Sequence, residues 1–197
     1  MSYSNKYIVF EGIDACGKST QAKLFCEFLK EQSMDVYFTK EPGGTDETKI
    51  IRDILLNKHL TPKTSLFLFL ADRAIHSELI KDKLKKSFVV SDRSMFSTIA
   101  YQGFGDGLDL DFIEYANSFA TGSMLPNLTI ILDITLETMN RRLKNKDVME
   151  SKGEDFFKRV KDGYRYVADK YENVYILNGE KHIDEIFQEV IEIWKSL

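Results

Sequence analysis

Residues 12–19 read GIDACGKS, and this short segment constrains the fold more than any other part of the chain. It matches the pattern G-x-x-x-x-G-K-[ST] of phosphate-binding loops. The apolar run from Tyr7 to Phe10 comes before it, and apolar residues at helical spacing follow it from Lys18 to Gln32. A strand, a glycine-rich loop and a helix in this order form the first unit of an α/β fold, so a parallel sheet is predicted.

The glycine-rich loop predicts a binding site for a nucleoside triphosphate with Mg²⁺. Glycines carry no Cβ, so successive backbone N–H groups can point into one concavity, and the helix start adds its positive dipole end. Lys18 is expected to reach the outer phosphates, and Ser19 offers a hydroxyl to Mg²⁺. A purely structural glycine turn is the alternative. The predicted ATP-binding residues are Gly12, Ile13, Asp14, Ala15, Cys16, Gly17, Lys18, Ser19 and Thr20.

Short apolar runs alternate with longer helical patterns along the rest of the chain, as they do where helices cross over a parallel sheet. Helices are predicted at 18–32, from 62 to about 86, from 136 to about 144, and along the apolar stripe of 183–194. No linker or repeat divides the chain, so residues 1–197 are expected to form one domain: a five-stranded parallel sheet with helices on both faces, the architecture of phosphate-loop kinases. The predicted strands are 7–10, 36–39, 88–91, 128–134 and 174–177.

Composition excludes several classes of partner and site. The chain has 27 Lys and Arg residues against 31 Asp and Glu residues, and no polybasic run that could bind nucleic acid or an anionic membrane. Cys16 and Cys26 are too few for a disulfide framework or a cysteine zinc site. The first residues lack a secretory signal and no apolar stretch is long enough to span a membrane, so a cytoplasmic protein is expected.

A second group of polar residues is predicted at the carboxyl ends of the strands. Asp92 and Arg93 follow the strand 88–91, and ligands bind at this edge of open α/β sheets. Asp92 suits the magnesium side of the site, and Arg93 could hold an acceptor phosphate. A surface salt bridge at the end of a strand is the alternative.

Two further segments contribute candidates for the acceptor side. Glu41 begins the turn EPGGT after the second strand, and Arg52 follows on an apparent helix. Phe69 and Arg73 lie four residues apart on one helix, where an aromatic ring beside a guanidinium could hold a base. By its pattern alone, Phe69 is more often a core residue.

These motifs together resemble those of thymidylate kinases, particularly the bacterial kind, over essentially the whole chain. The phosphate loop, EPGGT, the Phe69-x-x-x-Arg73 helix, the Asp92-Arg-Ser segment and Tyr101-Gln-Gly occur in the family's order and spacing. The resemblance implies transfer of the γ-phosphate of ATP to dTMP with Mg²⁺, which yields dTDP and ADP, and usually a homodimer.

The resemblance also implies roles for individual residues. Phe69 would stack on thymine and Arg73 would donate to the base, while Thr98 and Gln102 would face its edge and Tyr101 would lie beside the sugar. Asp14 would meet the 3′-hydroxyl or the metal shell. Arg52 and Arg93 would hold the acceptor phosphate, while Glu41 and Asp92 would order water and Mg²⁺. The catalytic residues so predicted are Lys18, Asp14, Asp92, Arg93 and Arg142, with Ser19 and Asp92 as the metal side.

The chain departs from the family pattern where a catalytic arginine is expected. Family members carry one either in the phosphate loop, where this chain has Ala15, or in the lid, where Val148 takes that place. Transfer of a phosphoryl group needs cationic charge on its equatorial oxygens. Within the predicted lid, about residues 141–154, Arg142 best matches an arginine that family members carry at the base of the lid, so the resemblance makes Arg142 the first candidate for this charge and Lys146 the second.

Two other readings remain open. The acceptor could be another nucleoside monophosphate, a deoxynucleoside or a small hydroxy metabolite, although Arg52 and Arg93 favour a phosphorylated one. The second alternative is a protein that is not a kinase: a switch protein that changes partners when it hydrolyses a nucleotide. Against it, residues 145–148 read NKDV rather than Asn-Lys-x-Asp, and no Asp-x-x-Gly occurs outside the phosphate loop. The three histidines, His59, His76 and His182, show no metal-ligand spacing.

Overall fold

A computed structural model describes residues 6–143 and 152–197 of the chain. Its centre is one sheet in which every strand pair is parallel and the strand order is β2-β3-β1-β4-β5. The predicted five-stranded parallel sheet is confirmed, with strand ends that differ from the predicted ones by one residue. The strands are β1 (Tyr7–Glu11), β2 (Val36–Lys40), β3 (Phe88–Asp92), β4 (Leu128–Asp133) and β5 (Val174–Asn178).

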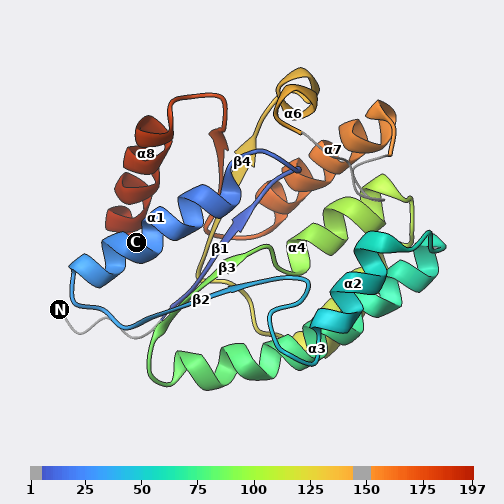
Figure 1. Ribbon diagram of the computed structural model, residues 1–197, viewed down its shortest axis with the longest axis horizontal. Helices are drawn as coiled ribbons and strands as arrows, with labels where there is room; N and C mark the ends of the chain where they lie inside the picture. The colour runs from blue at the N-terminus through green and yellow to red at the C-terminus, as the bar shows by residue number, and fades with distance from the viewer. Residues whose placement is uncertain (1–5, 144–151) are drawn as a thin grey trace.

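Helices cover both faces of the sheet (Figure 1). Helices α1 and α8 pack together on one face, and α3, α5 and α7 lie on the other side with the short segments α4 and η1. Their bounds are α1 (Lys18–Glu31), α2 (Lys49–Asn57), α3 (Pro62–Leu84), α4 (Met95–Thr98), the π-helical η1 (Ile99–Gly105), α5 (Leu110–Thr121), α6 (Leu136–Arg142), α7 (Glu154–Lys170) and α8 (Ile183–Ser196).

Alternation along β1 explains how one strand serves both faces. Ile8 and Phe10 belong to the larger core cluster with Phe25 of α1, whereas Tyr7 and Val9 pack with Ile80 of α3. Successive side chains of a strand point to opposite faces, so a buried central strand is apolar at every position rather than at alternate ones. This is why the run from Tyr7 to Phe10 is continuous.

The helix boundaries follow local capping chemistry. The Thr61 hydroxyl accepts a hydrogen bond from the backbone N–H of Thr64 at 3.2 Å, and Pro62 is the first residue of α3, as predicted. The helix ends at Leu84, two residues before the predicted end. Helix α6 ends at Arg142, and the predicted end at residue 144 lies outside the described residues.

The carboxyl ends of β1 and β3 meet at one edge of the sheet. Phe10 of β1 pairs in register with Asp92 of β3, so the loops after the two strands begin side by side. Among the described helices, none combines the length and apolarity needed to cross a membrane. The cytoplasmic location stays a prediction.

Candidate active site

The phosphate loop joins β1 to α1 and has the backbone that its glycines allow. Gly12 and Gly17 have φ values of 134° and 98°, in the region that L-residues rarely adopt. A Cβ on Gly12 would lie 2.5 Å from the carbonyl oxygen of Leu132 in the neighbouring strand. Cys16 is buried against this position. The glycine-rich pattern is therefore required by both backbone angle and close packing.

Lys18 and Ser19 begin α1 directly after the loop. The Lys18 ammonium donates to the carbonyl of Ile13 at 3.3 Å and lies 3.7 Å from the Asp14 carboxylate. The Ser19 hydroxyl donates to the Asp92 carboxylate, although 73 residues separate them. The structure thus brings together the two residues predicted for the metal side.

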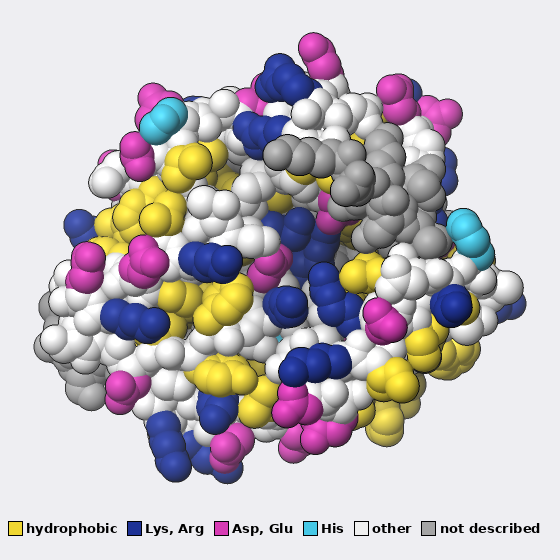
Figure 2. Space-filling view, in the orientation of Figure 1, with side chains coloured by type: hydrophobic (Ala, Val, Ile, Leu, Met, Phe, Trp, Pro, Cys, Tyr) yellow, Lys and Arg dark blue, Asp and Glu magenta, His cyan; other side chains and the backbone are white. Residues whose placement is uncertain are grey.

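A cavity lies beside this loop and collects side chains from several separate segments. Figure 2 shows Lys and Arg side chains gathered around a hollow near the centre of the face in view. Most residues predicted to bind the acceptor line this cavity, which we call the acceptor cavity; the phosphate loop, residues 12–20, is the donor loop. Its lining residues are Asp14, Glu41, Pro42, Arg52, Leu56, Phe69, Arg93, Ser97, Thr98, Tyr101 and Gln102.

Arg93 connects the phosphate loop with this cavity. Its Nη2 donates to Asp14 at 2.5 Å and to the Tyr101 hydroxyl at 3.3 Å, and its Nη1 donates to the carbonyl of Gly12 at 3.1 Å. The Tyr101 hydroxyl in turn donates to Asp14 at 2.9 Å. One guanidinium therefore belongs to both the donor loop and the acceptor cavity.

The charges around Asp14 keep its carboxyl ionised. Burial raises the pKa of this carboxyl, but the nearby charges of Arg93 and Lys18 and the hydrogen bond from Tyr101 outweigh burial, so the net pKa is lowered. Asp14 can therefore accept hydrogen bonds at neutral pH. This is the state that contact with a hydroxyl or a hydrated cation requires.

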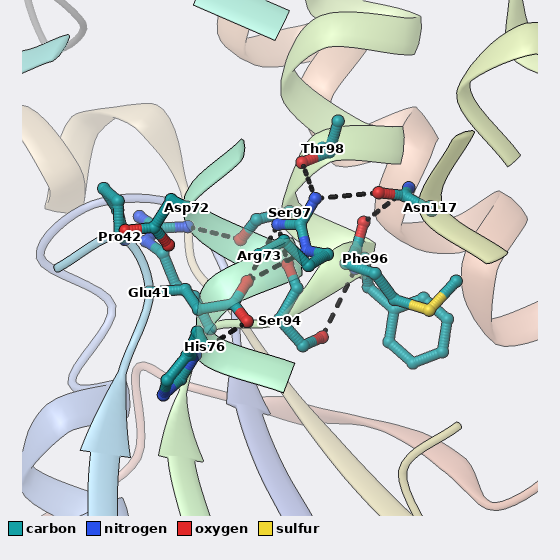
Figure 3. Close-up of polar contacts among 12 residues, drawn as sticks. Glu41, Pro42, Asp72, Arg73, His76, Ser94, Phe96, Ser97, Thr98 and Asn117 are labelled. Atoms are coloured by element: carbon teal, nitrogen blue, oxygen red, sulfur yellow. Dashed lines mark hydrogen bonds and ion pairs between the residues drawn. The ribbon is translucent and has the colours of Figure 1, made fainter. Parts of the chain in front are cut away.

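Arg73 lies behind the cavity wall rather than on it, and it is 2% exposed. All five of its N–H groups have partners (Figure 3): Nε and Nη2 donate to Glu41, Nη2 also to the carbonyl of Ser94, and Nη1 to Thr98 and Asn117. Direct donation to a base would require one of these partners to be displaced. The predicted contact of Arg73 with a base stays a prediction, and the geometry shows Arg73 holding Thr98, which does line the cavity.

Glu41 is shared between Arg73 and His76, a histidine to which the sequence assigned no role in the site. His76 is fully buried, with Nδ1 2.9 Å from Glu41 Oε1 and Nε2 2.6 Å from the Thr39 hydroxyl. Burial raises the pKa of Glu41, but Arg73 and His76 outweigh it, and the net pKa is lowered. The spacing along α3 indicated this contact: His76 lies three residues after Arg73, so both side chains lie on nearly the same face of the helix.

Gln102 is a cavity residue with a buried donor that lacks a partner. It is buried within η1, and its Nε2 has no hydrogen-bond partner among the described residues. Buried polar atoms are nearly always paired, so an orphaned donor in a cavity wall points to a ligand acceptor. The position of Gln102 agrees with the predicted base edge, and its role stays a prediction.

Arg142 approaches the phosphate loop from α6. Its Nη1 lies 3.3 Å from the carbonyl oxygen of Ala15 and 3.4 Å from that of Gly179. Together with Thr20, these residues line a second cavity on the far side of the loop. Lys146 and Val148 lie outside the described residues, as does most of the predicted lid at 141–154.

Glu11 and Tyr164 are further buried polar groups that sequence reasoning missed. Glu11 is the last residue of β1, directly before the phosphate loop, and the Tyr164 hydroxyl of α7 donates to its carboxylate at 2.9 Å. An acidic residue ending an otherwise apolar buried strand was the available signal. Nothing in the sequence shows that Tyr164, 153 residues later, is its partner.

Comparison with known proteins gives one consistent result. A family model described as "Thymidylate kinase" matches residues 10–190. A thymidylate kinase from Kosmotoga olearia is 38% identical over 194 residues, which cover 94% of this chain and 93% of the relative. A probable thymidylate kinase from Methanocaldococcus jannaschii is 41% identical over 194 residues, with 98% and 97% covered. The crystal structure of thymidylate kinase from Ehrlichia chaffeensis superimposes with a TM-score of 0.82 at 32% identity and covers 98% of this chain and 99% of that chain.

Proposed function

The chain belongs to the thymidylate kinase family, and on this premise we propose that it transfers the γ-phosphate of ATP to dTMP, which yields ADP and dTDP. One observation carries the proposal: Arg93 lines the acceptor cavity and also pairs with Asp14 of the phosphate loop at 2.5 Å. The two nucleotides would therefore meet at a shared arginine. Phosphoryl transfer depends mainly on such positioning and on stabilisation of charge.

The cavity supports a phosphorylated nucleoside as the acceptor. Arg52 and Arg93 supply cationic donors for its phosphate, and Phe69 supplies an aromatic ring for its base. Thr98 and the unpaired Nε2 of Gln102 would meet the base edge. The remaining roles proposed are Tyr101 beside the sugar, Asp14 at the 3′-hydroxyl, Arg73 as the support of Thr98 and as base donor, and Glu41 as the anchor of Arg73.

Ser19 and Asp92 are the proposed residues on the side of Mg²⁺. Both offer oxygen atoms, and their direct hydrogen bond puts these oxygens next to the start of α1. Mg²⁺ is usually bound by one or two such groups together with substrate phosphates and water, rather than by a cage of protein ligands. When bound, the ion neutralises charge on the phosphate oxygens. The donor set fits this kind of site.

The cations around the loop have distinct proposed roles in the transfer. Lys18 moves from the Ile13 carbonyl to the outer phosphates of ATP, and Arg93 faces the acceptor phosphate. Arg142 is proposed as the cation that replaces the arginine missing at Ala15, because its guanidinium already lies beside the carbonyl of that residue. The second cavity, which Arg142 and Thr20 line, is proposed for the donor nucleoside.

We also propose that two copies of the chain associate through α3 and α5. Phe112, Tyr115 and Phe119 lie on one face of α5, and Phe119 is 81% exposed. The Phe112 ring packs edge-on to that of Phe67 from α3, with centroids 6.3 Å apart. Monomers rarely expose such continuous apolar area. Light scattering behind a sizing column should give a dimer mass for the parent and a monomer mass for Phe119→Glu; a monomeric parent contradicts the proposal.

A single coupled assay tests the function against its alternatives. ADP formation should depend on an added acceptor, and dTMP should be strongly preferred among the four common deoxynucleoside monophosphates. ATP or GTP hydrolysis without an acceptor would support a switch protein instead. Equal turnover of thymidine and dTMP would support a nucleoside kinase. The Lys18→Ala variant is the control for contaminating kinases.

A further inference from the structure

Glu11 is a fully buried carboxylate that the proposed reaction does not use. Oε1 accepts from the backbone N–H and hydroxyl of Ser94 at 2.8 and 2.9 Å and from the N–H of Ser97 at 3.2 Å. Oε2 accepts from the hydroxyls of Ser97 and Tyr164 at 2.6 and 2.9 Å. Every one of these partners is a donor, so the carboxylate organises the chain from residue 94 to residue 97 around itself.

The two hydroxyls pass this organisation on to Arg93. Burial raises the pKa of the Glu11 carboxyl, and the charge of Arg93 and the hydrogen bonds from Ser97, Ser94 and Tyr164 act against that rise. Both carboxyl oxygens accept hydrogen bonds, so the protons of the Ser97 and Tyr164 hydroxyls are turned toward Glu11. Their lone pairs are then free to accept from Arg93 Nη1, which lies 3.0 Å from the Ser97 oxygen and 3.2 Å from the Tyr164 oxygen. Every hydrogen bond in this array therefore donates in the same direction, from the Arg93 guanidinium through the two hydroxyls to the Glu11 carboxylate.

The backbone of Arg93 is held in an unusual conformation at the same place. Its φ is 76°, a value that side-chain-bearing residues seldom adopt and that persists where surrounding contacts enforce it. The Arg93 N–H donates to the carbonyl of Phe10 at 2.9 Å, and the Ser91 hydroxyl donates to the Arg93 carbonyl at 2.7 Å. Backbone and side chain are thus restrained independently of each other, as a group with a demanding position requires.

We propose that Glu11 is a positioning residue that, through the hydroxyls of Ser97 and Tyr164, holds the Arg93 guanidinium between the phosphate loop and the acceptor cavity. This rests on the proposed function, in which Arg93 binds the acceptor phosphate. Tyr164 is the second positioning residue of the array. Neither residue lines the acceptor cavity, so the loss of either is expected to weaken recognition of the acceptor phosphate and to spare recognition of the nucleoside.

The experiment compares the affinities of dTMP and thymidine, which differ only by the phosphate. Calorimetry on the full chain gives the ratio of the thymidine Kd to the dTMP Kd for the parent, Glu11→Gln and Tyr164→Phe. A hydrogen bond to a charged group contributes enough that the ratio should fall about tenfold in each variant, while the thymidine Kd stays within about twofold. Tyr166→Phe is the matched control and should keep the parent ratio. Tyr166 lies on α7 like Tyr164, but its hydroxyl donates to Glu114 of α5, and neither residue lines the acceptor cavity.

Three outcomes overturn the proposal. The first is a parent ratio retained in both variants. The second is an equal loss of dTMP and thymidine affinity, which would assign Glu11 and Tyr164 to general stability. The third is a parent that binds thymidine as tightly as dTMP, which removes the proposed role of Arg93 itself and so is distinguishable from the first. If Glu11→Gln does not fold, Tyr164→Phe alone decides, because it removes a single oxygen.

The same array predicts how the variants combine. In an Arg93→Lys background, the Tyr164 hydroxyl no longer has a guanidinium to orient, since an ammonium has different donor geometry. Tyr164→Phe should then change the ratio less than about twofold, against about tenfold in the parent. A full tenfold loss in that background would mean that Tyr164 acts by another route and would overturn the proposal.

Discussion

The donor loop and the acceptor cavity lie side by side and are built in opposite ways. Nine consecutive residues, Gly12 to Thr20, make the loop, and its chemistry depends on backbone angles at Gly12 and Gly17. The cavity instead takes side chains from the loop after β2, from α2 and α3, and from the segments that follow β3. Buried charge pairs such as Arg73 with Glu41 hold these pieces together.

Because of this difference, a mutation in the donor loop can lower activity without lowering stability, whereas a mutation in the acceptor cavity is expected to lower both. Lys18 makes weak contacts in the folded chain, so the donor side can lose its key cation and remain folded. On the acceptor side the recognition residues depend on buried partners, so a change there alters recognition and folding together. Measuring both activity and unfolding free energy for variants of each region tests this difference directly.

The largest effect is expected for Lys18→Ala on the donor side. Loss of the cation that reaches the outer phosphates should lower kcat about 1,000-fold, or ~4 kcal/mol of transition-state stabilisation. Thermal unfolding should stay close to that of the parent, because within residues 6–143 and 152–197 the Lys18 ammonium donates only to the Ile13 carbonyl and lies 3.7 Å from the Asp14 carboxylate. Turnover near the parent rate would remove the phosphate loop from the mechanism.

Glu41→Gln should show the opposite behaviour on the acceptor side. Removal of this charge leaves Arg73 buried without its ion partner, which typically costs ~3 kcal/mol or more of unfolding free energy. Urea unfolding followed by circular dichroism measures this loss. Asp46→Asn is a control, because Asp46 forms an exposed ion pair with Lys49 and should change stability little. Equal stability of the two variants would contradict the view that buried charges hold the cavity together.

Arg142→Ala tests whether the donor side includes a cation from outside the loop. We expect kcat to fall by more than about tenfold, or ~1.4 kcal/mol, because the guanidinium lies beside the Ala15 carbonyl and can reach the triphosphate. Single-turnover measurements separate this from slow release of product. Arg141→Ala is the control on the same helix, and it should keep the parent rate. A smaller drop makes Arg142 a bystander.

Arg73→Ala should change the choice of acceptor. Thr98 and Glu41 both lose a partner, so we expect the preference for dTMP over dUMP and dCMP to fall about tenfold in kcat/KM. The KM for ATP should change little, because the donor loop makes no contact with Arg73 among the contacts described. An unchanged preference would show that Arg73 takes no part in reading the base.

The smallest effect concerns the pH dependence of stability. The pKa of Glu41 is lowered in the folded chain from its ordinary value of 4.5, so its ion pair stabilises the fold above about that pH. That contribution is lost as the pH falls through the lower folded-state value. The stability difference between the parent and Glu41→Gln should therefore shrink between pH 7 and pH 3, as measured by urea unfolding. A constant difference would mean that the charge of Glu41 is not what stabilises the cavity.

Local features were predictable because short-range physics determines them. The strand before the phosphate loop, the Thr61 cap with Pro62, and the five apolar runs all depend on neighbours within a few residues. Helix ends were less predictable: α3 ends at Leu84 rather than near residue 86, since fraying depends on small energies. The positions of Asp92 and Arg93 at the edge of the sheet followed from topology alone.

The partners of buried charges were not predictable in the same way. Glu11, His76 and Tyr164 have no motif spacing, yet each is buried against a residue of the cavity or loop. The contact of Arg73 with a base stays a prediction, but its buried partners Glu41, Thr98 and Asn117 could not be read from the sequence. Which carboxylate meets which guanidinium depends on three-dimensional packing, which the order of residues along the chain does not reveal.

By itself, the sequence determined the α/β fold, the phosphate loop and the set of residues gathered at one edge of the sheet, because periodicity, glycine conformations and strand polarity act locally. Only the tertiary structure decided that Ser19 donates to Asp92, that Arg93 contacts both the loop and the cavity, and that Glu11 accepts from the hydroxyls beside Arg93. Such contacts join residues far apart in the chain. The free energy of burying a charge is recovered only where a distant partner arrives with the right geometry.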